Sequence, residues 1–155
     1  MPEDWLDVEE LKSKIGIEGK SEVYKIEQGM IQRFAQAVDD PNPLWQNEGY
    51  AKKKKYGSII APPTLIPVIG FGQNQYMSAS ASSETLLHGG TELECYQPVR
   101  PGDMITVTTK IADVRERRSQ ERGRMVFMTL DMIYENQRQE LVARCRQKLI
   151  SYKPG

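Results

Sequence analysis

Hydrophobic residues in the second half of the chain alternate with polar ones, which is the period of a strand that buries one face. Ile105, Val107 and Ile111 show this alternation, and so do Cys145 and Leu149. The pattern predicts four strands, at residues 91–97, 103–117, 124–135 and 140–152. Short polar connections between the last three predict hairpins that join long antiparallel strands.

The first half of the chain has a helical period instead. Apolar residues at helical spacing predict one helix at 5–14 and a second that begins at Glu27. The second helix ends at 39–43, because its two prolines cannot lie inside a helix. Residues 20–26 alternate like a short strand, and 47–55 predict a short polar helix.

The most apolar stretch covers residues 59–71 and reads IIAPPTLIPVIGF. A stretch of about a dozen apolar residues is too long for a typical strand, so it predicts a buried central helix. Pro62 and Pro63 suit the start of that helix, and Pro67 predicts a kink or a break. The small polar residues at 73–85 predict a loop.

These elements predict an α+β fold, in which a twisted antiparallel sheet wraps around one long apolar helix. We expect a single domain over residues 1–155, with 1–15 as an N-terminal helical extension. A chain of 155 residues buries about 70% of its unfolded surface, which is enough for a core without disulfides or metals.

Charge and composition exclude several classes of protein. The chain has 21 basic and 21 acidic residues, which argues against a protein that coats nucleic acid or an anionic membrane. No apolar run is long enough to span a bilayer, and the acidic N-terminus lacks a signal segment. With only Cys95 and Cys145, which we expect to be buried, the cytoplasm is the predicted location. The single histidine, His88, excludes a two-histidine metal site, and no metal is predicted.

Four separated motifs carry a family resemblance. Residues 34–45 read FAQAVDDPNPLW, and three further motifs follow in order at 56–63, 87–92 and 100–103. Together they resemble the MaoC-like (R)-specific enoyl-thioester hydratases and dehydratases, which adopt the hot-dog fold. The resemblance runs from about Ile15 to Tyr152 and is strongest to the N-terminal MaoC-type dehydratase branch. That branch includes accessory subunits that lack the catalytic histidine.

The resemblance implies a substrate but no cofactor. The substrate is an acyl thioester of coenzyme A or of a carrier protein's phosphopantetheine arm. Hydration of an enoyl thioester needs an acid and a base, and hydrogen-bond donors for the developing enolate oxygen. In the active family, an aspartate, a histidine five residues later and a backbone N–H at the start of the central helix fill these roles.

This sequence departs from that pattern at two places. Asp40 is present, but Trp45 stands at the histidine position and has no basic lone pair. Pro62 stands at the position of the backbone donor and has no N–H. Asp40 and His88 are the remaining catalytic candidates, although Asp40 and Asn42 beside prolines are also typical turn formers.

The resemblance also implies binding residues. The candidates for substrate contact are Asn42, Trp45, Ile60, Ala61, Pro62, Pro63, Gly89 and Gly90. The candidates for phosphate contact form the lysine run, which consists of Lys52, Lys53, Lys54 and Lys55. A solvated helix end is the alternative interpretation of the lysine run, and packing is the alternative for Trp45.

Three functional hypotheses follow. The first is a non-catalytic or weakly catalytic subunit of a heteromeric hydratase, in which a partner hot-dog chain supplies the aspartate and histidine. The second is a stand-alone hot-dog homodimer, a dehydratase or thioesterase that combines Asp40 with His88 or Glu92. The third is an acyl-thioester binding module without catalysis. The sequence leaves open whether the chain alone is an enzyme; fatty acid or steroid side-chain metabolism is the expected setting.

Overall fold

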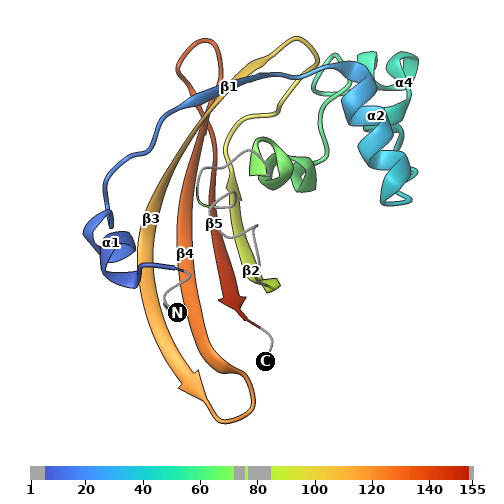
Figure 1. Ribbon diagram of the computed structural model, residues 1–155. Helices are drawn as coiled ribbons and strands as arrows, with labels where there is room; N and C mark the ends of the chain where they lie inside the picture. Colours follow the sequence, from blue (N-terminus) through green and yellow to red (C-terminus); the bar gives the residue numbers. More distant parts are fainter. Residues whose placement is uncertain (1–5, 72–75, 77–84, 154–155) are drawn as a thin grey trace.

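The computed structural model describes residues 6–71, 76 and 85–153. The described residues form a five-stranded antiparallel sheet in the order β1-β3-β4-β5-β2, which curves around a short helix (Figure 1). The helices are α1 (Val8–Ser13), α2 (Gln28–Ala37), α3 (Pro43–Gln46), α4 (Glu48–Lys52) and the 3-10 helix η1 (Pro63–Val68). The strands are β1 (Glu22–Lys25), β2 (Thr85–Cys95), β3 (Met104–Ser119), β4 (Gly123–Glu135) and β5 (Leu141–Tyr152).

The long strands β3, β4 and β5 confirm the predicted hairpins. Buried and partly exposed residues alternate along β3 and β4, so one face of the sheet lies on the core. The motif at 100–103 forms a turn before β3, in which Gly102 has a φ of 90° and the Asp103 N–H donates to the Arg100 carbonyl at 3.1 Å.

The central helix is shorter than predicted. Within the stretch 59–71, Pro63–Val68 forms a 3-10 helix, and residues 59–62 are not helical. Pro67 lacks the N–H that would donate to the Pro63 carbonyl in an α-helix. The hydrogen bonds that form join residues three positions apart, such as Leu65 N–H to the Pro62 carbonyl at 2.9 Å. Residues 72–75 and 77–84, most of the predicted loop, lie outside the described residues.

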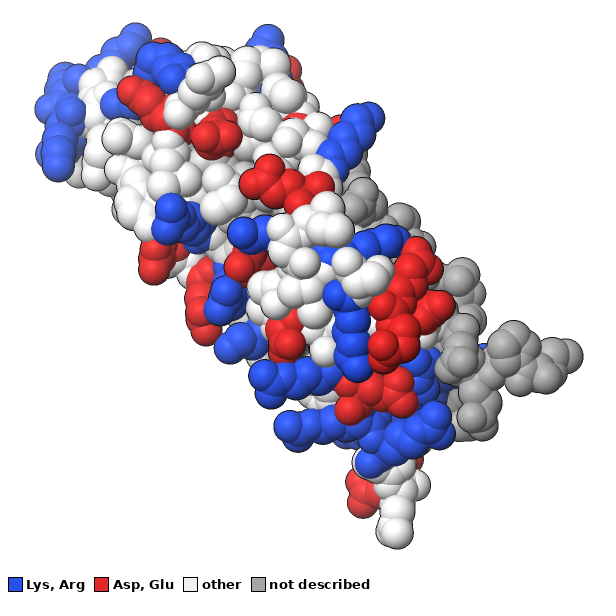
Figure 2. Space-filling view, turned by 90° about the vertical axis from the view of Figure 1, so that its left-hand side faces the viewer, with Lys and Arg blue, Asp and Glu red and all other residues white. Residues whose placement is uncertain are grey.

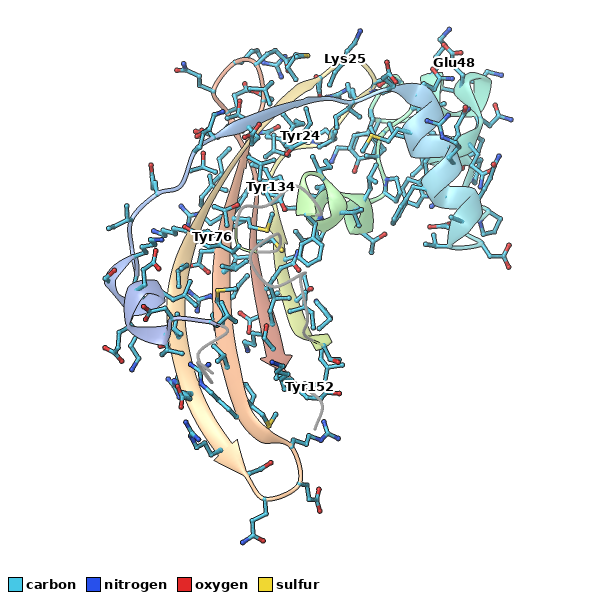
Figure 3. All side chains as sticks on the ribbon, viewed as in Figure 1. Tyr24, Lys25, Glu48, Tyr76, Tyr134 and Tyr152 are labelled. Atoms are coloured by element: carbon cyan, nitrogen blue, oxygen red, sulfur yellow. The ribbon has the colours of Figure 1, made fainter. Side chains whose placement is uncertain are left out.

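The helix η1 nevertheless fills the concave face of the sheet. Leu65 and Ile66 are buried in the same cluster as Tyr134, which points from β4 toward η1 (Figure 3). A second cluster lies under α1, where Leu6 and Val8 pack with Ile111 and other residues of β3, β4 and β5. The sheet therefore holds two adjoining cores on one face.

The strand β2 begins six residues earlier than predicted, at Thr85 instead of 91. Gly89 and Gly90 both lie within the strand, at a bulge in its register with β5. A Cβ at Gly89 would lie 3.1 Å from the Lys148 carbonyl oxygen, which is a tight contact, so the close approach of the two strands favours glycine there. His88 also lies on this strand.

The predicted helix over 47–55 is divided into two short helices. Asn47 ends α3, and its side chain begins α4 by accepting the Tyr50 N–H at 2.9 Å. Of the two cysteines, Cys145 is buried as predicted, whereas Cys95 is exposed. The prediction was wrong for Cys95 because this residue ends a strand at the edge of the sheet.

Acidic and basic side chains intermingle over the face that carries β3 and α1 (Figure 2). Many form ion pairs along or between strands, such as Arg124 with Glu116 at 3.1 Å and Arg115 with Asp113 at 2.7 Å. Arg124 also donates to the carbonyl of Leu6 at 2.8 Å, which attaches the segment before α1 to the sheet. No helix in the described part of the chain is long and apolar enough to cross a membrane.

Candidate functional site

The segment that contains Asp40 begins where α2 ends. Asp39 adopts a left-handed conformation with a φ of 54°, and the Asp40 N–H donates to the Ala35 carbonyl at 2.8 Å. This is the hydrogen bond that closes the last turn of a helix when the chain reverses. The end of α2 therefore fixes the backbone position of Asp40.

The side chains of Asp40 and Asn42 both form hydrogen bonds with backbone groups. Asp40 Oδ1 accepts the Asn42 N–H at 3.1 Å, and Asn42 Oδ1 accepts the Leu44 N–H at 3.0 Å. Asn42 is the N-cap of α3, and Pro43 occupies the first position of that helix. These contacts are those of turn formers; catalysis by Asp40 and substrate contact by Asn42 stay predictions.

Trp45 lies on α3 and packs half-buried against the first core cluster. Its indole Nε1 is buried and has no hydrogen-bond partner among the described residues. An indole N–H can donate but cannot accept a proton, so this position offers no general base.

Residues 59–61 connect this segment to the turn before β3. The Ile60 N–H donates to the Leu44 carbonyl at 3.3 Å, and the Ala61 N–H donates to the Val99 carbonyl at 2.8 Å. Pro62 follows as the buried N-cap of η1 and has no N–H to offer. The structure thus brings three of the four sequence motifs together.

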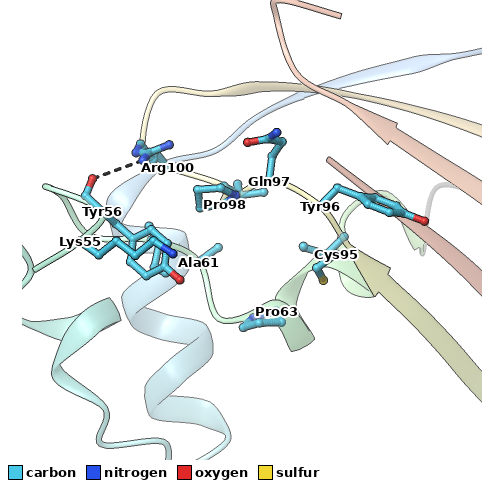
Figure 4. A pocket seen from close by; sticks show the side chains of 12 residues that line it. Lys55, Tyr56, Ala61, Pro63, Cys95, Tyr96, Gln97, Pro98 and Arg100 are labelled. Atoms are coloured by element: carbon cyan, nitrogen blue, oxygen red, sulfur yellow. Dashed lines mark hydrogen bonds between the residues drawn. The ribbon is translucent and has the colours of Figure 1, made fainter. Parts of the chain in front are cut away.

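A surface hollow of about 510 Å³ opens beside this junction (Figure 4). Among the predicted binding residues, Ile60, Ala61, Pro63 and Lys55 line it. The remaining lining residues are Tyr56, Ile66, Cys95, Tyr96, Gln97, Pro98, Val99 and Arg100. Asp40, Asn42, Trp45 and Pro62 are not among them, so the hollow and the Asp40 turn are adjacent features and not one pocket.

The lysine run, Lys52–Lys55, is exposed and points in several directions. Lys52 forms an ion pair with Glu48 at 3.1 Å, one turn earlier on α4. The Lys54 ammonium lies over a tyrosine ring at 4.6 Å from the centroid. Only Lys55 of the four lines the hollow.

His88 and its glycines lie elsewhere, on β2. The His88 side chain is exposed, and its Nε2 shares a hydrogen bond with Thr91 Oγ1 at 2.7 Å. Neither His88 nor Gly89 nor Gly90 lines the hollow, and no hydrogen bond between described residues links His88 to Asp40. The hypothesis that these two residues act as a catalytic pair gains no geometric support.

The sequence interpretation missed several residues that line the hollow. Arg100 was considered only as part of a turn, yet its guanidinium donates to the Tyr56 carbonyl at 3.3 Å across the rim (Figure 4). Partial burial raises the pKa of the Cys95 thiol above its usual value, which keeps it protonated at neutral pH. Within the described part of the chain, no group of three histidine, cysteine or acidic side chains could hold a metal ion.

Comparison with known proteins agrees with this architecture. The family model of the FAS1-like dehydratase domain region matches residues 13–145. A UPF0336 protein of Thermobifida fusca is 36% identical over 104 residues, which cover 61% of this chain and 64% of that protein. The probable enoyl-CoA hydratase alpha subunit of Thermomonospora curvata is 26% identical over 141 residues, 81% of this chain and 44% of that protein. The alignments thus span less than two thirds of either relative.

Solved structures share the fold. A MaoC-like dehydratase from Rhodospirillum rubrum superposes with a TM-score of 0.65 at 25% identity, covering 91% of this chain and 94% of that one. The ChsH1-ChsH2 complex from Mycobacterium tuberculosis contains a chain with a TM-score of 0.70 at 18% identity, covering 96% and 95%. These likenesses confirm the predicted hot-dog fold.

Proposed function

We propose, because this chain belongs to the FAS1-like dehydratase family, that it is the non-catalytic or weakly catalytic subunit of a heteromeric enoyl-thioester hydratase, or 3-hydroxyacyl dehydratase. Its substrate is an acyl thioester of coenzyme A or of a carrier protein, and the reaction needs no cofactor. A partner chain of the same fold supplies the aspartate and histidine.

One observation carries this proposal: the two groups that the chemistry needs are replaced together. Trp45 offers no base, and Pro62 offers no backbone donor at the start of η1. Loss of general acid–base catalysis costs about 100- to 10,000-fold, and loss of an oxyanion donor costs about 100- to 1,000-fold more. A chain that lacks both groups needs a partner for efficient hydration.

The strand β2 offers a place for that partner. It is the last strand of the sheet, and in the described part of the chain it pairs only with β5. Its outer edge therefore presents unpaired backbone groups, to which a strand of a second chain could add. The hollow lies at one end of β2, since Cys95 is the final residue of the strand.

The role of this chain is then to shape the substrate pocket. Apolar residues of the hollow, such as Ile60, Ala61 and Pro63, lie next to the edge where the partner would bind. A partner strand that pairs with the outer edge of β2 would continue the sheet beside Cys95. It would also add residues of the partner chain to the hollow. Support for a two-chain assembly comes from the ChsH1-ChsH2 complex, whose chain has the same fold.

Reconstitution with a candidate partner tests the proposal. We expect an enoyl-CoA to be hydrated rapidly by the mixture with a MaoC-like chain that retains its Asp-x-Asn-Pro-x-His segment, and slowly or not at all by this chain alone. Co-elution on a sizing column should accompany the activity. Rates for the isolated chain that match those of active hydratases would refute the subunit model.

A pair of matched substitutions identifies which chain does the chemistry. Aspartate to asparagine in the partner's motif should lower kcat of the mixture by about 100-fold or more. Asp40→Asn in this chain should leave kcat nearly unchanged, because the amide oxygen can still accept the Asn42 N–H. The reverse result would favour a stand-alone enzyme, and thioester binding without turnover in any mixture would favour a binding module.

A further inference from the structure

Two cations, Lys55 and Arg100, line the same end of the hollow (Figure 4). They come from distant parts of the sequence, Lys55 from the segment after α4 and Arg100 from the turn before β3. Neither forms an ion pair with a carboxylate among the described residues, in contrast to Lys52, whose ammonium lies 3.1 Å from Glu48. The Lys55 ammonium lies 5.8 Å from the centroid of the Tyr56 ring. Neither positive charge is neutralised by a described carboxylate, so both can attract an anionic ligand.

The surrounding contacts hold Arg100 in place. Its backbone N–H donates to Asp103 Oδ2 at 2.8 Å, and its guanidinium donates to the Tyr56 carbonyl at 3.3 Å. The second oxygen of Asp103 accepts the Gln137 amide at 3.0 Å, so that carboxylate is occupied by other donors. A guanidinium fixed through one N–H has further donors for a second acceptor.

The rest of the hollow suits an uncharged, flexible chain. Ile60, Ala61 and Pro63 form its apolar wall, and Gln97 adds an amide on the opposite side (Figure 4). Cys95 and Tyr96 lie at the end away from the two cations. A ligand that fits has an anionic group at one end and an arm of amides and methylenes leading toward β2.

We infer that Lys55 and Arg100 bind the phosphate of a phosphopantetheine arm, with the arm running along the hollow toward Cys95. The inference rests on the proposed function and deepens it, because it adds Arg100 to the site and selects Lys55 from the lysine run. Lys55 supplies a mobile point charge, and Arg100 supplies fixed, charge-assisted hydrogen bonds to phosphate oxygens. Coenzyme A and a carrier protein both present this phosphate, so both are candidate sources.

Binding to the full-length chain tests the inference with three small probes. We expect coenzyme A and 4′-phosphopantetheine to bind more tightly than pantetheine, which lacks the phosphate. Lys55→Gln and Arg100→Gln should each lower the affinity for the two phosphorylated probes by about tenfold, which corresponds to the loss of one charge-assisted contact. The affinity for pantetheine should not change. Holo and apo forms of an acyl carrier protein, compared in the same way, distinguish the two sources.

Matched controls separate a specific site from general electrostatic attraction. Lys20→Gln and Arg117→Gln remove the same charges from exposed positions outside the hollow. These controls should leave all affinities unchanged. An equal loss in the controls, equal binding of pantetheine and coenzyme A, or no binding of coenzyme A by the wild-type chain would overturn the inference.

Thiol protection shows where the probes bind. Cys95 is exposed at the far end of the hollow, and Cys145 is buried, so a maleimide should modify Cys95 first. Coenzyme A lacking its own thiol should slow that modification several-fold in the wild type and much less in Arg100→Gln. Unchanged labelling with bound ligand would place the ligand elsewhere. If these tests fail while the two-chain mixture hydrates enoyl-CoA, the phosphate site is wrong and the proposed function stands.

Discussion

The backbone N–H of Ala61 donates to the carbonyl of Val99 at 2.8 Å and joins the central segment to the turn before β3. This bond holds the start of η1 against the sheet and sets the floor of the hollow. Because Pro62 comes next, the bond also fixes a residue without an N–H at the start of η1, where the family resemblance predicts a backbone donor.

Restoring the histidine alone should therefore fail to create a hydratase. We expect Trp45→His to hydrate an enoyl-CoA no faster than the wild-type chain, as followed by loss of the enoyl absorbance. Trp45→His combined with Pro62→Gly should be faster than either single variant by about 100-fold, because it regains a base and a donor. A large gain from Trp45→His alone would show that the donor lies elsewhere.

Removing the cap of α3 should destabilise the protein. Asn42→Ala leaves the Leu44 N–H without its acceptor, and we expect the free energy of unfolding to fall by about 1 kcal/mol in urea titrations. Asn42→Ser retains a side-chain oxygen and should lose much less. Equal stability of Asn42→Ala and the wild type would count against the turn-forming role.

Two glycines with similar backbone angles should respond differently to substitution. Gly16 has a φ of 78° and open space around it, whereas Gly70 has a φ of 72° and a Cβ there would lie 2.7 Å from the Tyr24 ring. Gly16→Ala should cost about 1 kcal/mol, the strain of a left-handed alanine. Gly70→Ala should cost about 3 kcal/mol, because overpacking adds to that strain. Thermal unfolding of both variants tests the difference.

The ion pair between Asp131 and Arg146 should make the free energy of unfolding depend on pH. Arg146 donates two hydrogen bonds, at 2.7 and 2.9 Å, which hold the pKa of the Asp131 carboxyl below its usual value of 3.8. The contribution of this ion pair to stability is fully present above the pKa of Asp131 in the unfolded chain. It is lost as the pH falls through the lower pKa of Asp131 in the folded protein.

The expected contribution is small because the Arg146 side chain is 48% exposed. In unfolding titrations from about pH 6 to pH 3, the wild type should lose about 0.5 kcal/mol more than Arg146→Gln. Arg144→Gln, on the same strand and with no ion pair among the described residues, serves as the control and should follow the wild type.

The sheet could be predicted from the sequence because strand periodicity is a local signal. Ile105, Val107 and Ile111 alternate over a long stretch, and their burial follows the same alternation. The central helix was predicted too long, because apolar character was weighed above Pro67. The start of β2 was placed too late, at 91, although residues 85–90 also belong to the strand.

The candidate site was harder to predict because it depends on contacts between distant segments. The apolar wall at Ile60 and Ala61 followed from the family resemblance, and the structure places both residues in the hollow. Arg100 could not be recognised from the sequence as a residue of the hollow, because its place in a turn motif already accounts for it. Only the fold shows that the turn brings its guanidinium to Tyr56, 44 positions away along the chain, and into the hollow that Lys55 also lines.

In the proposed two-chain assembly, the open edge of β2 would link the amount of this chain to the amount of its partner. A copy made in excess exposes a strand of 11 residues whose outer backbone groups remain available for other edges, and such a template promotes aggregation and invites proteolysis. We expect unassembled copies to be degraded faster than assembled ones. Balanced subunit numbers in the cell would then arise from selective turnover and would not require equal rates of synthesis.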